Sequence, residues 1–523
     1  TASRHGRIWE VVIPKLANAD EIGAYNLKIN VPLSFGPELY LSPKTAASEE
    51  SDRRVYLYNK ESFRKTGIIL AFGTAQNFDF KLIYHLNNPN IFSSKTKIAF
   101  PPDILGVQQI IYRQIKPSPT QVEVDTDGNY LATYLLAGSQ TTEVILEGKA
   151  IIYHPTRDLS KSGLIKDIPP NLVKLYTKPG KYWEVGDPEI KALTAKISNP
   201  EQTAAKVAEE IFNYVTANLT YSPSRISTEL SRFGAKDSLK NSDQAVCMEF
   251  TDLLVTLLRA AGIPARGLEG YAYTDNPNSR PAPEDALHTW AEIYLPNIGW
   301  ISVDPTWAAT TNGLDYFSKL DTNHIVFAVK GIDSEYPFPA GTYKVGAGGK
   351  QDIEISFSDN SEFTPKENLV FNVSFPVKIN GGLPVTGKIR LINEGSAAVF
   401  GVNGEVEIKG LNPPYRKKIN FGTIPPLGSK EMEISFHEES FLKIGEAALT
   451  VRLNYLTFSG AVKNLNHDQA FRIVTVFVEP DLNPLTIALG LGLLSILFFL
   501  LSLLGIPQKL LDRLLDRLPA RGR

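Results

Sequence analysis

Cys247, in the stretch DQAVCMEF at 243–250, is the only cysteine in the 523 residues. A thiol can be a small core residue or a nucleophile, and a nucleophilic thiol needs a base together with a group that orients the base. Of the seven histidines, His288 begins the stretch HTWAEIYL, and the following stretch WISVDPTW contains Asp304. These three residue types, in this order, make a candidate set for covalent acyl chemistry.

The residues after Cys247 predict a helix with one buried face. Apolar residues recur at the i, i+3, i+4, i+7 spacing, namely Phe250, Leu253, Leu254, Leu257, Leu258 and Ala261. Gly262 and Pro264 predict its end, and Ser242 and Asp243 are candidate caps. Cys247 falls in the first turn, where the helix dipole favours a thiolate. A small core residue would fit this position equally well.

The two later stretches predict a β-hairpin that brings a histidine and an aspartate together. Alternation places His288, Trp290, Glu292 and Tyr294 on one strand face. If the loop is the three residues 296–298, Asp304 faces Trp290 and lies diagonal to His288, within side-chain reach. A loop of two or four residues would instead put the pair on opposite faces.

The runs CMEFTDLLVTLLRAAGIPARGLEGY, LHTWAEIYL and GWISVDPTW resemble the three catalytic segments of the transglutaminase-like superfamily, over about residues 201–330. The resemblance implies a papain-like α+β core in which Cys247, His288 and Asp304 form a Cys-His-Asp triad. It also implies acyl transfer through a thioester, from a protein carboxamide or peptide bond to an amine or to water. The family usually has glycine two residues before the cysteine, where this chain has Ala245.

Some details of the implied site stay open in the sequence. The backbone N–H of Cys247 is one expected oxyanion donor, and Gln244 and Tyr221 are candidates for the second. No calcium-site motif or cofactor motif is apparent, so neither a metal nor a cofactor is predicted. His324 is expected to be a surface or structural histidine, and the arginines Arg259 and Arg266 are expected to be structural.

We predict a multidomain α+β chain. Strand-like runs predict an N-terminal β-sandwich region over 1–165, either one sandwich or two small packed ones. The catalytic core with its connector is expected over 166–340. Strand-like runs from IEISF onward predict an immunoglobulin-like β-sandwich over 350–480.

The C-terminal part predicts a single membrane span. Residues 485–506 carry no charge and would measure roughly 33 Å as a helix, against a bilayer core of about 30 Å. The tail 507–523 is rich in Lys and Arg, which predicts that it is cytoplasmic and that the bulk of the chain lies outside the plasma membrane. The chain begins at Thr1, and its first twenty residues hold no apolar run; removal of a signal peptide would explain both observations, and so would truncation of the chain.

The net charge of −2 gives no global field that would favour nucleic acid. The resemblance implies a protein or peptide substrate as one partner, and the C-terminal helix predicts the membrane as another. The leading hypothesis is a membrane-anchored, extracytoplasmic cysteine enzyme that cross-links or hydrolyses protein. The alternative is a catalytically silent adhesion or scaffold protein that keeps the same fold.

Overall fold

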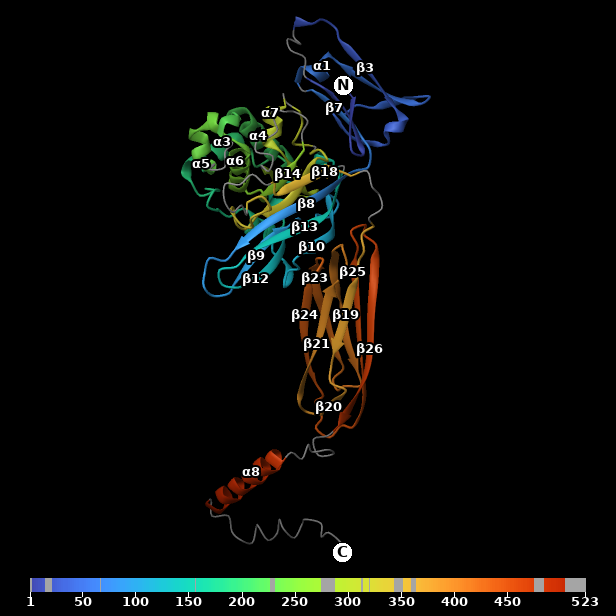
Figure 1. Ribbon diagram of the computed structural model, residues 1–523, viewed down its shortest axis with the longest axis vertical. Helices are drawn as coiled ribbons and strands as arrows, with labels where there is room; N and C mark the ends of the chain where they lie inside the picture. Colours follow the sequence, from blue (N-terminus) through green and yellow to red (C-terminus); the bar gives the residue numbers. More distant parts are fainter. Residues whose placement is uncertain are drawn as a thin grey trace.

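The computed structural model describes residues 2–14, 21–65, 67–155, 157–225, 231–273, 287–311, 314–318, 320–342, 351–358, 364–474 and 484–503. Strands outnumber helices, and the described strands form seven sheets. The chain is therefore mostly β, and the expectation of an α+β protein is wrong for the whole chain. Most of the described helices gather in the region around the candidate site, where they pack with a sheet (Figure 1).

The N-terminal body is built of two small sheets around one apolar core. One sheet holds β1 (Ala2–His5), β2 (Ile8–Ile13), β7 (Ile68–Phe72) and β4 (Glu38–Ser42) in that order, and the other holds β3 (Asn26–Pro32), β6 (Arg53–Asn59) and β5 (Ala47–Glu50). Helix α1 (Lys60–Lys65) follows β6. Alternate residues such as Ile29, Val31, Tyr56 and Tyr58 point into the core between the sheets.

A second sandwich follows in the chain, so the N-terminal region contains two packed bodies. Its first sheet has the order β10 (Gln108–Lys116), β13 (Thr141–Tyr153), β8 (Ala75–Asn87) and β18 (Ile353–Phe357). Its second sheet has the order β11 (Gln121–Val124), β12 (Tyr130–Leu136) and β9 (Ser94–Phe100). Strand β18 is the run IEISF, which we expected in the C-terminal sandwich; it pairs with β8 instead.

The core that carries the candidate site places helices on one face of a four-stranded antiparallel sheet. The sheet order is β16 (Gly299–Val303), β15 (His288–Leu295), β14 (Ala265–Ala272) and β17 (His324–Lys330). The helices are α2 (Pro170–Tyr176), α3 (Pro188–Ile197), α4 (Ala204–Asn218), α5 (Ala235–Lys240), α6 (Cys247–Ala260) and α7 (Pro305–Thr310). Helix α6 packs against α3, α4 and α5 and against strands β14 and β15.

The two faces of β15 meet different surroundings. Ala291, Ile293 and Leu295 join the apolar cluster that includes α4 and α6. Trp290, on the opposite face, joins a smaller cluster with Leu268 and Val326. The predicted alternation along this strand is therefore confirmed.

The C-terminal part of the chain forms a separate sandwich of two facing sheets around one core. One sheet has the order β19 (Leu369–Ser374), β21 (Pro384–Asn393) and β24 (Ser429–His437). The other has the order β20 (Lys378–Asn380), β26 (Val462–Val474), β25 (Gly445–Leu456), β22 (Val399–Lys409) and β23 (Tyr415–Ile424). The domain boundaries drawn from the sequence stay predictions.

The predicted membrane span is not supported. Among the described residues, no helix combines the length and the apolarity that crossing a membrane requires. The helix that forms in this region, α8 (Pro484–Leu503), lies beyond the C-terminal sandwich (Figure 1). The prediction assumed that one helix occupies the whole uncharged run, but 504–506 and the tail 507–523 lie outside the described residues. The predicted topology and location have not been tested.

Candidate active site

Cys247 is the first residue of α6, as the apolar spacing predicts. Phe250, Leu253, Leu254, Leu257 and Leu258 are all fully buried, and Gly262 ends the helix with a φ of +84°. The thiol itself is partly exposed and free. Cys247 is thus a partly exposed residue at the start of a helix that is mostly buried.

The cap of α6 differs from the prediction. Ser242 and Asp243 lie in a separate 3-10 helix, and Val246 is the N-cap residue. The carboxylate of Glu249 accepts the Val246 N–H at 3.0 Å and the Phe233 N–H at 3.1 Å, and it pairs with Arg225 at 3.2 Å. Glu249 reaches back from the first turn, so no side chain before the helix is needed as a cap.

Ala245 fits its position without strain. Its φ of −78° and ψ of 142° are extended backbone, a conformation that any residue adopts. Its N–H donates to Thr220 at 3.2 Å and its carbonyl accepts from Ser222 at 2.8 Å. Alanine in place of the usual glycine therefore causes no distortion of the approach to Cys247.

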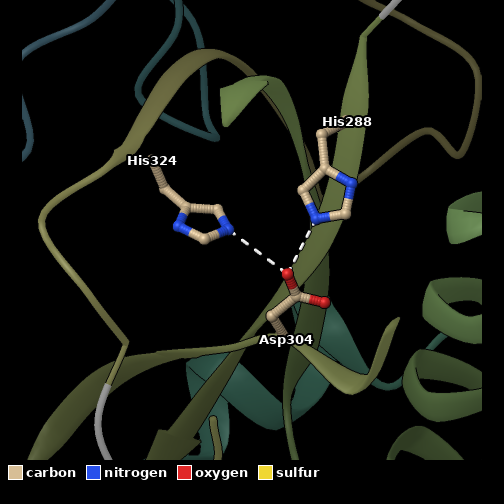
Figure 2. Close-up of side chains that lie close together, drawn as sticks. All are labelled: His288, Asp304 and His324. Atoms are coloured by element: carbon tan, nitrogen blue, oxygen red, sulfur yellow. Dashed lines mark hydrogen bonds and ion pairs between the residues drawn. The ribbon is translucent and has the colours of Figure 1, made fainter. Parts of the chain in front are cut away.

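The hairpin forms with the three-residue loop, the alternative that brings the histidine and the aspartate to one face. Leu295 pairs with Gly299 and Ala291 with Val303, so the loop has three residues and Asp304 comes opposite Trp290. The His288 Nε2 lies 2.7 Å from the Asp304 Oδ2 (Figure 2). The histidine and the aspartate proposed from the sequence are thus brought together.

Asp304 is fully buried and has four hydrogen-bond donors around its two oxygens. Its Oδ1 accepts the N–H groups of Thr306 at 2.9 Å and Trp307 at 3.0 Å, which makes Asp304 the N-cap of α7. Its Oδ2 is shared by His288 and His324. Burial alone would raise the pKa of this carboxyl, but the charge and hydrogen bond of His288, followed by those of His324, hold it below its ordinary value.

His288 is packed between aromatic rings and charged partners. Its ring stacks on Trp290, with centroids 5.8 Å apart and planes at 17°, and it lies 5.6 Å from the Trp307 ring. Burial alone would lower the pKa of His288, but the charge and hydrogen bond of Asp304, followed by those of Cys247, raise it to about 10. The Cys247 thiol is therefore part of the electrostatic surroundings of this ring.

His324 was expected at the surface or in a structural role, and the structure places it in the site. It is buried at the start of β17, with its Nε2 3.2 Å from the Asp304 Oδ2 and its Nδ1 2.7 Å from the Asp321 Oδ1. The charge of Asp321, followed by the hydrogen bond that His324 donates to Asp304, raises the pKa of His324 against the effect of burial. In the sequence, the sign of this pairing was the spacing of Asp321 and His324, which are three residues apart.

The two oxyanion candidates differ in position. Gln244 is exposed. Tyr221 is half-buried beside Ala245, with which it forms a parallel bridge. Burial, followed by the negative charges of Cys247 and Asp304, raises the pKa of the Tyr221 phenol, so its O–H remains a donor near the thiol.

His288, Asp304 and His324 also form the one described group whose spacing would suit a metal ion, because their ligand atoms lie within 4.8 Å of one another. These atoms already form hydrogen bonds with one another (Figure 2). We therefore assign the group to hydrogen bonding.

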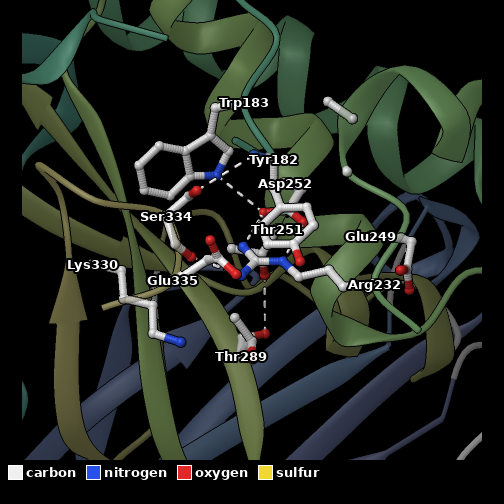
Figure 3. Close-up of polar contacts among 12 residues, drawn as sticks. Tyr182, Trp183, Arg232, Glu249, Thr251, Asp252, Thr289, Lys330, Ser334 and Glu335 are labelled. Carbon is white, nitrogen blue, oxygen red and sulfur yellow. Dashed lines mark hydrogen bonds and ion pairs between the residues drawn. The ribbon is translucent and has the colours of Figure 1, made fainter. Parts of the chain in front are cut away.

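A buried ion pair anchors the middle of α6 (Figure 3). Asp252 accepts from the Arg232 Nε at 2.7 Å, from an Arg232 terminal nitrogen at 2.5 Å and from the Trp183 Nε1 at 3.0 Å. Arg259 donates to three backbone carbonyls, and Arg266 pairs with Glu292. Both are structural, as predicted.

The family model described as the transglutaminase-like superfamily matches residues 191–305. Two curated relatives are an uncharacterised protein, YebA, of Bacillus subtilis, 27% identical over 143 residues, and a protein-glutamine gamma-glutamyltransferase of Pseudomonas aeruginosa, 30% identical over 129 residues. The matches cover 25% and 23% of this chain. They span only 19% of each relative.

Two solved structures are similar to parts of the chain. One is described as a cysteine protease of Cytophaga hutchinsonii, with 18% identity, a TM-score of 0.40, and coverage of 56% of this chain and 94% of that one. The other is red sea bream transglutaminase, with 11% identity, a TM-score of 0.23, and coverage of 74% and 80%. The family model spans Cys247, His288 and Asp304, and residues 191–305 of this chain are therefore assigned to the transglutaminase-like superfamily.

Proposed function

We propose that the chain is a cysteine acyl-transfer enzyme in which Cys247 is the nucleophile, His288 the acid and base, and Asp304 the group that orients His288. One observation carries the proposal. The His288 Nε2 is held 2.7 Å from the buried Asp304 carboxylate while the same ring interacts with Cys247. Because Nε2 is engaged by Asp304, the other ring nitrogen, Nδ1, is left for the thiol.

The first half of the reaction forms a thioester. The Cys247 thiolate attacks the carbonyl carbon of a carboxamide, and the His288 imidazolium gives its proton to the leaving nitrogen, which departs as ammonia. Asp304 keeps the ring oriented and stabilises its positive charge, in line with the raised pKa of His288. The neutral ring then takes a proton from the incoming amine or water, whose attack breaks the C–S bond.

Negative charge on the tetrahedral oxygen needs donors. The N-terminus of α6 begins at Cys247, so its free backbone N–H groups and the helix dipole favour an oxyanion there. We assign the second donor to the Tyr221 O–H, which stays protonated beside the thiol.

The acyl donor is best taken as the side-chain amide of glutamine in a protein or peptide. The support is the similarity to the relative named protein-glutamine gamma-glutamyltransferase, which is 30% identical over 129 residues. The same triad serves an amine acceptor and water equally, so cross-linking and hydrolysis are the two outcomes to be separated by experiment.

The test incubates the full chain with a glutamine peptide and a labelled primary amine, followed by mass spectrometry of the peptide. Amine incorporation, deamidation and backbone cleavage give three different masses. Cys247→Ala should abolish all of them. His85→Gln is the matched control, because His85 also pairs with carboxylates, at 3.0 Å from Asp352, but lies in the middle sandwich.

A second measurement does not depend on the choice of peptide. The rate of Cys247 alkylation by iodoacetamide, followed across pH, reports the ionisation of the thiol and of its histidine partner. His288→Ala should change the shape of this profile. A thiol that titrates near roughly 8.5 and is indifferent to His288→Ala would mean that the enzyme proposal is wrong.

A further inference from the structure

The predicted triad is extended by a second histidine and a second aspartate. Asp321, His324 and Asp304 form a continuous hydrogen-bonded chain, with contacts of 2.7 and 3.2 Å on the two sides of the His324 ring. All three side chains are at least nine-tenths buried. His324 lies on β17, so this chain ties Asp304 to the far edge of the core sheet.

The hydrogen-bond partners determine the protonation of His324. Both of its nitrogens face carboxylate oxygens, and an ionised carboxylate only accepts hydrogen bonds. Both nitrogens must therefore carry a proton, which makes the ring a cation.

We propose that His324, held as an imidazolium between Asp321 and Asp304, is a positioning residue that keeps the Asp304 carboxylate aimed at His288 and offsets part of its charge. The proposal rests on the function proposed above, since it concerns the same site. His324 acts on the chemistry through Asp304, whose Oδ2 both histidines share, and through its own charge beside His288.

Other charged groups surround this pair, and they come from several elements. From the core, Cys247, Tyr221 and Tyr316 interact electrostatically with residues of the site. From the N-terminal body, Tyr40 and Glu10 interact with Asp321 or with Tyr316. His154 and Arg157 line a cavity of about 60 Å³ together with Asp321 and His324. His324 is itself a cation in this neighbourhood, so removing it shifts the local balance toward negative charge.

Replacing His324 changes the pKa of His288 in two ways, and both changes raise it. Without the His324 cation, His288 loses a repelling charge, with the two ring centroids 5.6 Å apart. Without the shared hydrogen bond, the Asp304 Oδ2 serves His288 alone. Both changes favour the imidazolium form of His288. Coulomb's law, with an effective dielectric constant between about 20 and 80, puts the shift at roughly 0.5 to 2 pH units upward.

The test measures ring protonation and thiol reactivity in the full chain. Ring ¹⁵N shifts of histidine-labelled protein should show His324 doubly protonated, without titration through neutral pH. In His324→Gln, the alkaline inflection of the Cys247 alkylation profile should move upward by roughly 0.5 to 2 pH units. The control His85→Gln should leave that inflection in place.

Asp321→Asn supplies a second variant that keeps the hydrogen-bond acceptor and removes its charge. Here His324 should start to lose its second proton within the titrated range, visible in the ring ¹⁵N shifts. A His324 ring that titrates near roughly 6.5 in the unaltered chain would overturn the proposal. So would an alkylation inflection that His324→Gln leaves unmoved.

Neither measurement needs turnover, so the two proposals fail separately. If no peptide is modified but His324 is doubly protonated and its variant shifts the inflection, the positioning role stands and the enzyme function falls. If peptides are modified but the inflection does not move, the reverse holds.

Discussion

Replacing Asp252 by asparagine tests how the buried ion pair stabilises the core. Asp252 is fully buried and accepts three hydrogen bonds, two from Arg232 and one from Trp183. An asparagine amide has one oxygen, so its NH₂ group must face at least one of these N–H donors. Arg232, whose side chain is only 14% exposed, would then be left without its counter-charge.

The size of the loss in stability depends on the contacts that Arg232 keeps in the variant. Removing one partner of a buried ion pair costs about 3–5 kcal/mol. Arg232 keeps its hydrogen bond to the Ser334 carbonyl at 2.7 Å and its stacking over Tyr182 at 4.2 Å, so we expect the lower end, about 3 kcal/mol. This corresponds to roughly a hundredfold change in the unfolding equilibrium of the core.

Urea unfolding followed by tryptophan fluorescence is a suitable assay, because four of the five tryptophans lie in the core and only Trp9 lies in the N-terminal body. Asp237→Asn is the matched control, since its ion pair with Lys240 is exposed and should contribute no more than about 0.5 kcal/mol. A loss of unfolding free energy below about 1 kcal/mol for Asp252→Asn would refute the reasoning. So would a double variant Asp252→Asn, Arg232→Gln whose loss equals the sum of the two single losses, because the two side chains would then be uncoupled.

Two further predictions concern the site. Asp304→Asn removes the charge that raises the pKa of His288 to about 10. A raised pKa of His288 stabilises the fold below about pH 6.5, and this contribution is lost as the pH rises toward 10. The unfolding free energy of the variant should therefore fall less over that pH range than that of the unaltered chain, and parallel curves of unfolding free energy against pH would contradict this. Gly270→Ala places a Cβ 2.0 Å from the Ile325 carbonyl oxygen, whereas a Cβ at Gly267 on the same strand meets nothing closer than 3.7 Å. In the same urea assay, Gly270→Ala should therefore lower the unfolding free energy by about 2–3 kcal/mol and Gly267→Ala by less than about 1 kcal/mol. Equal losses for the two substitutions would contradict the expected clash with the Ile325 carbonyl.

The parts of the site that depend on local pattern were predictable. The helical period after Cys247 identified the residues that α6 buries. The three-residue loop determined the hairpin register and thereby the approach of Asp304 to His288. Both rest on short-range geometry, in which the period of the element decides which side chains share a face.

The parts that depend on distant segments were not predictable. Strand β18 alternates like any strand, and nothing in IEISF indicates that its partner is β8, far earlier in the chain. His324 begins a continuously buried strand whose neighbour is β14, so its position next to Asp304 follows from the sheet order. The membrane prediction is not supported, because no helix among the described residues combines the length and the apolarity that a membrane span requires.

Asp304 shows how local and distant constraints meet in one group. As the N-cap of α7, followed by Pro305 at the first helical position, it points its Oδ1 at two backbone N–H groups, and this is a property of the short run DPTW. Its Oδ2 is thereby fixed in direction, and two histidines from different strands converge on it. The cap explains why this carboxylate cannot turn away from His288, because any rotation would break the start of a helix. Because His324 shares Oδ2, part of the Asp304 charge acts on His324 and not on His288. The alkylation profile of His324→Gln measures how that charge is divided between the two histidines.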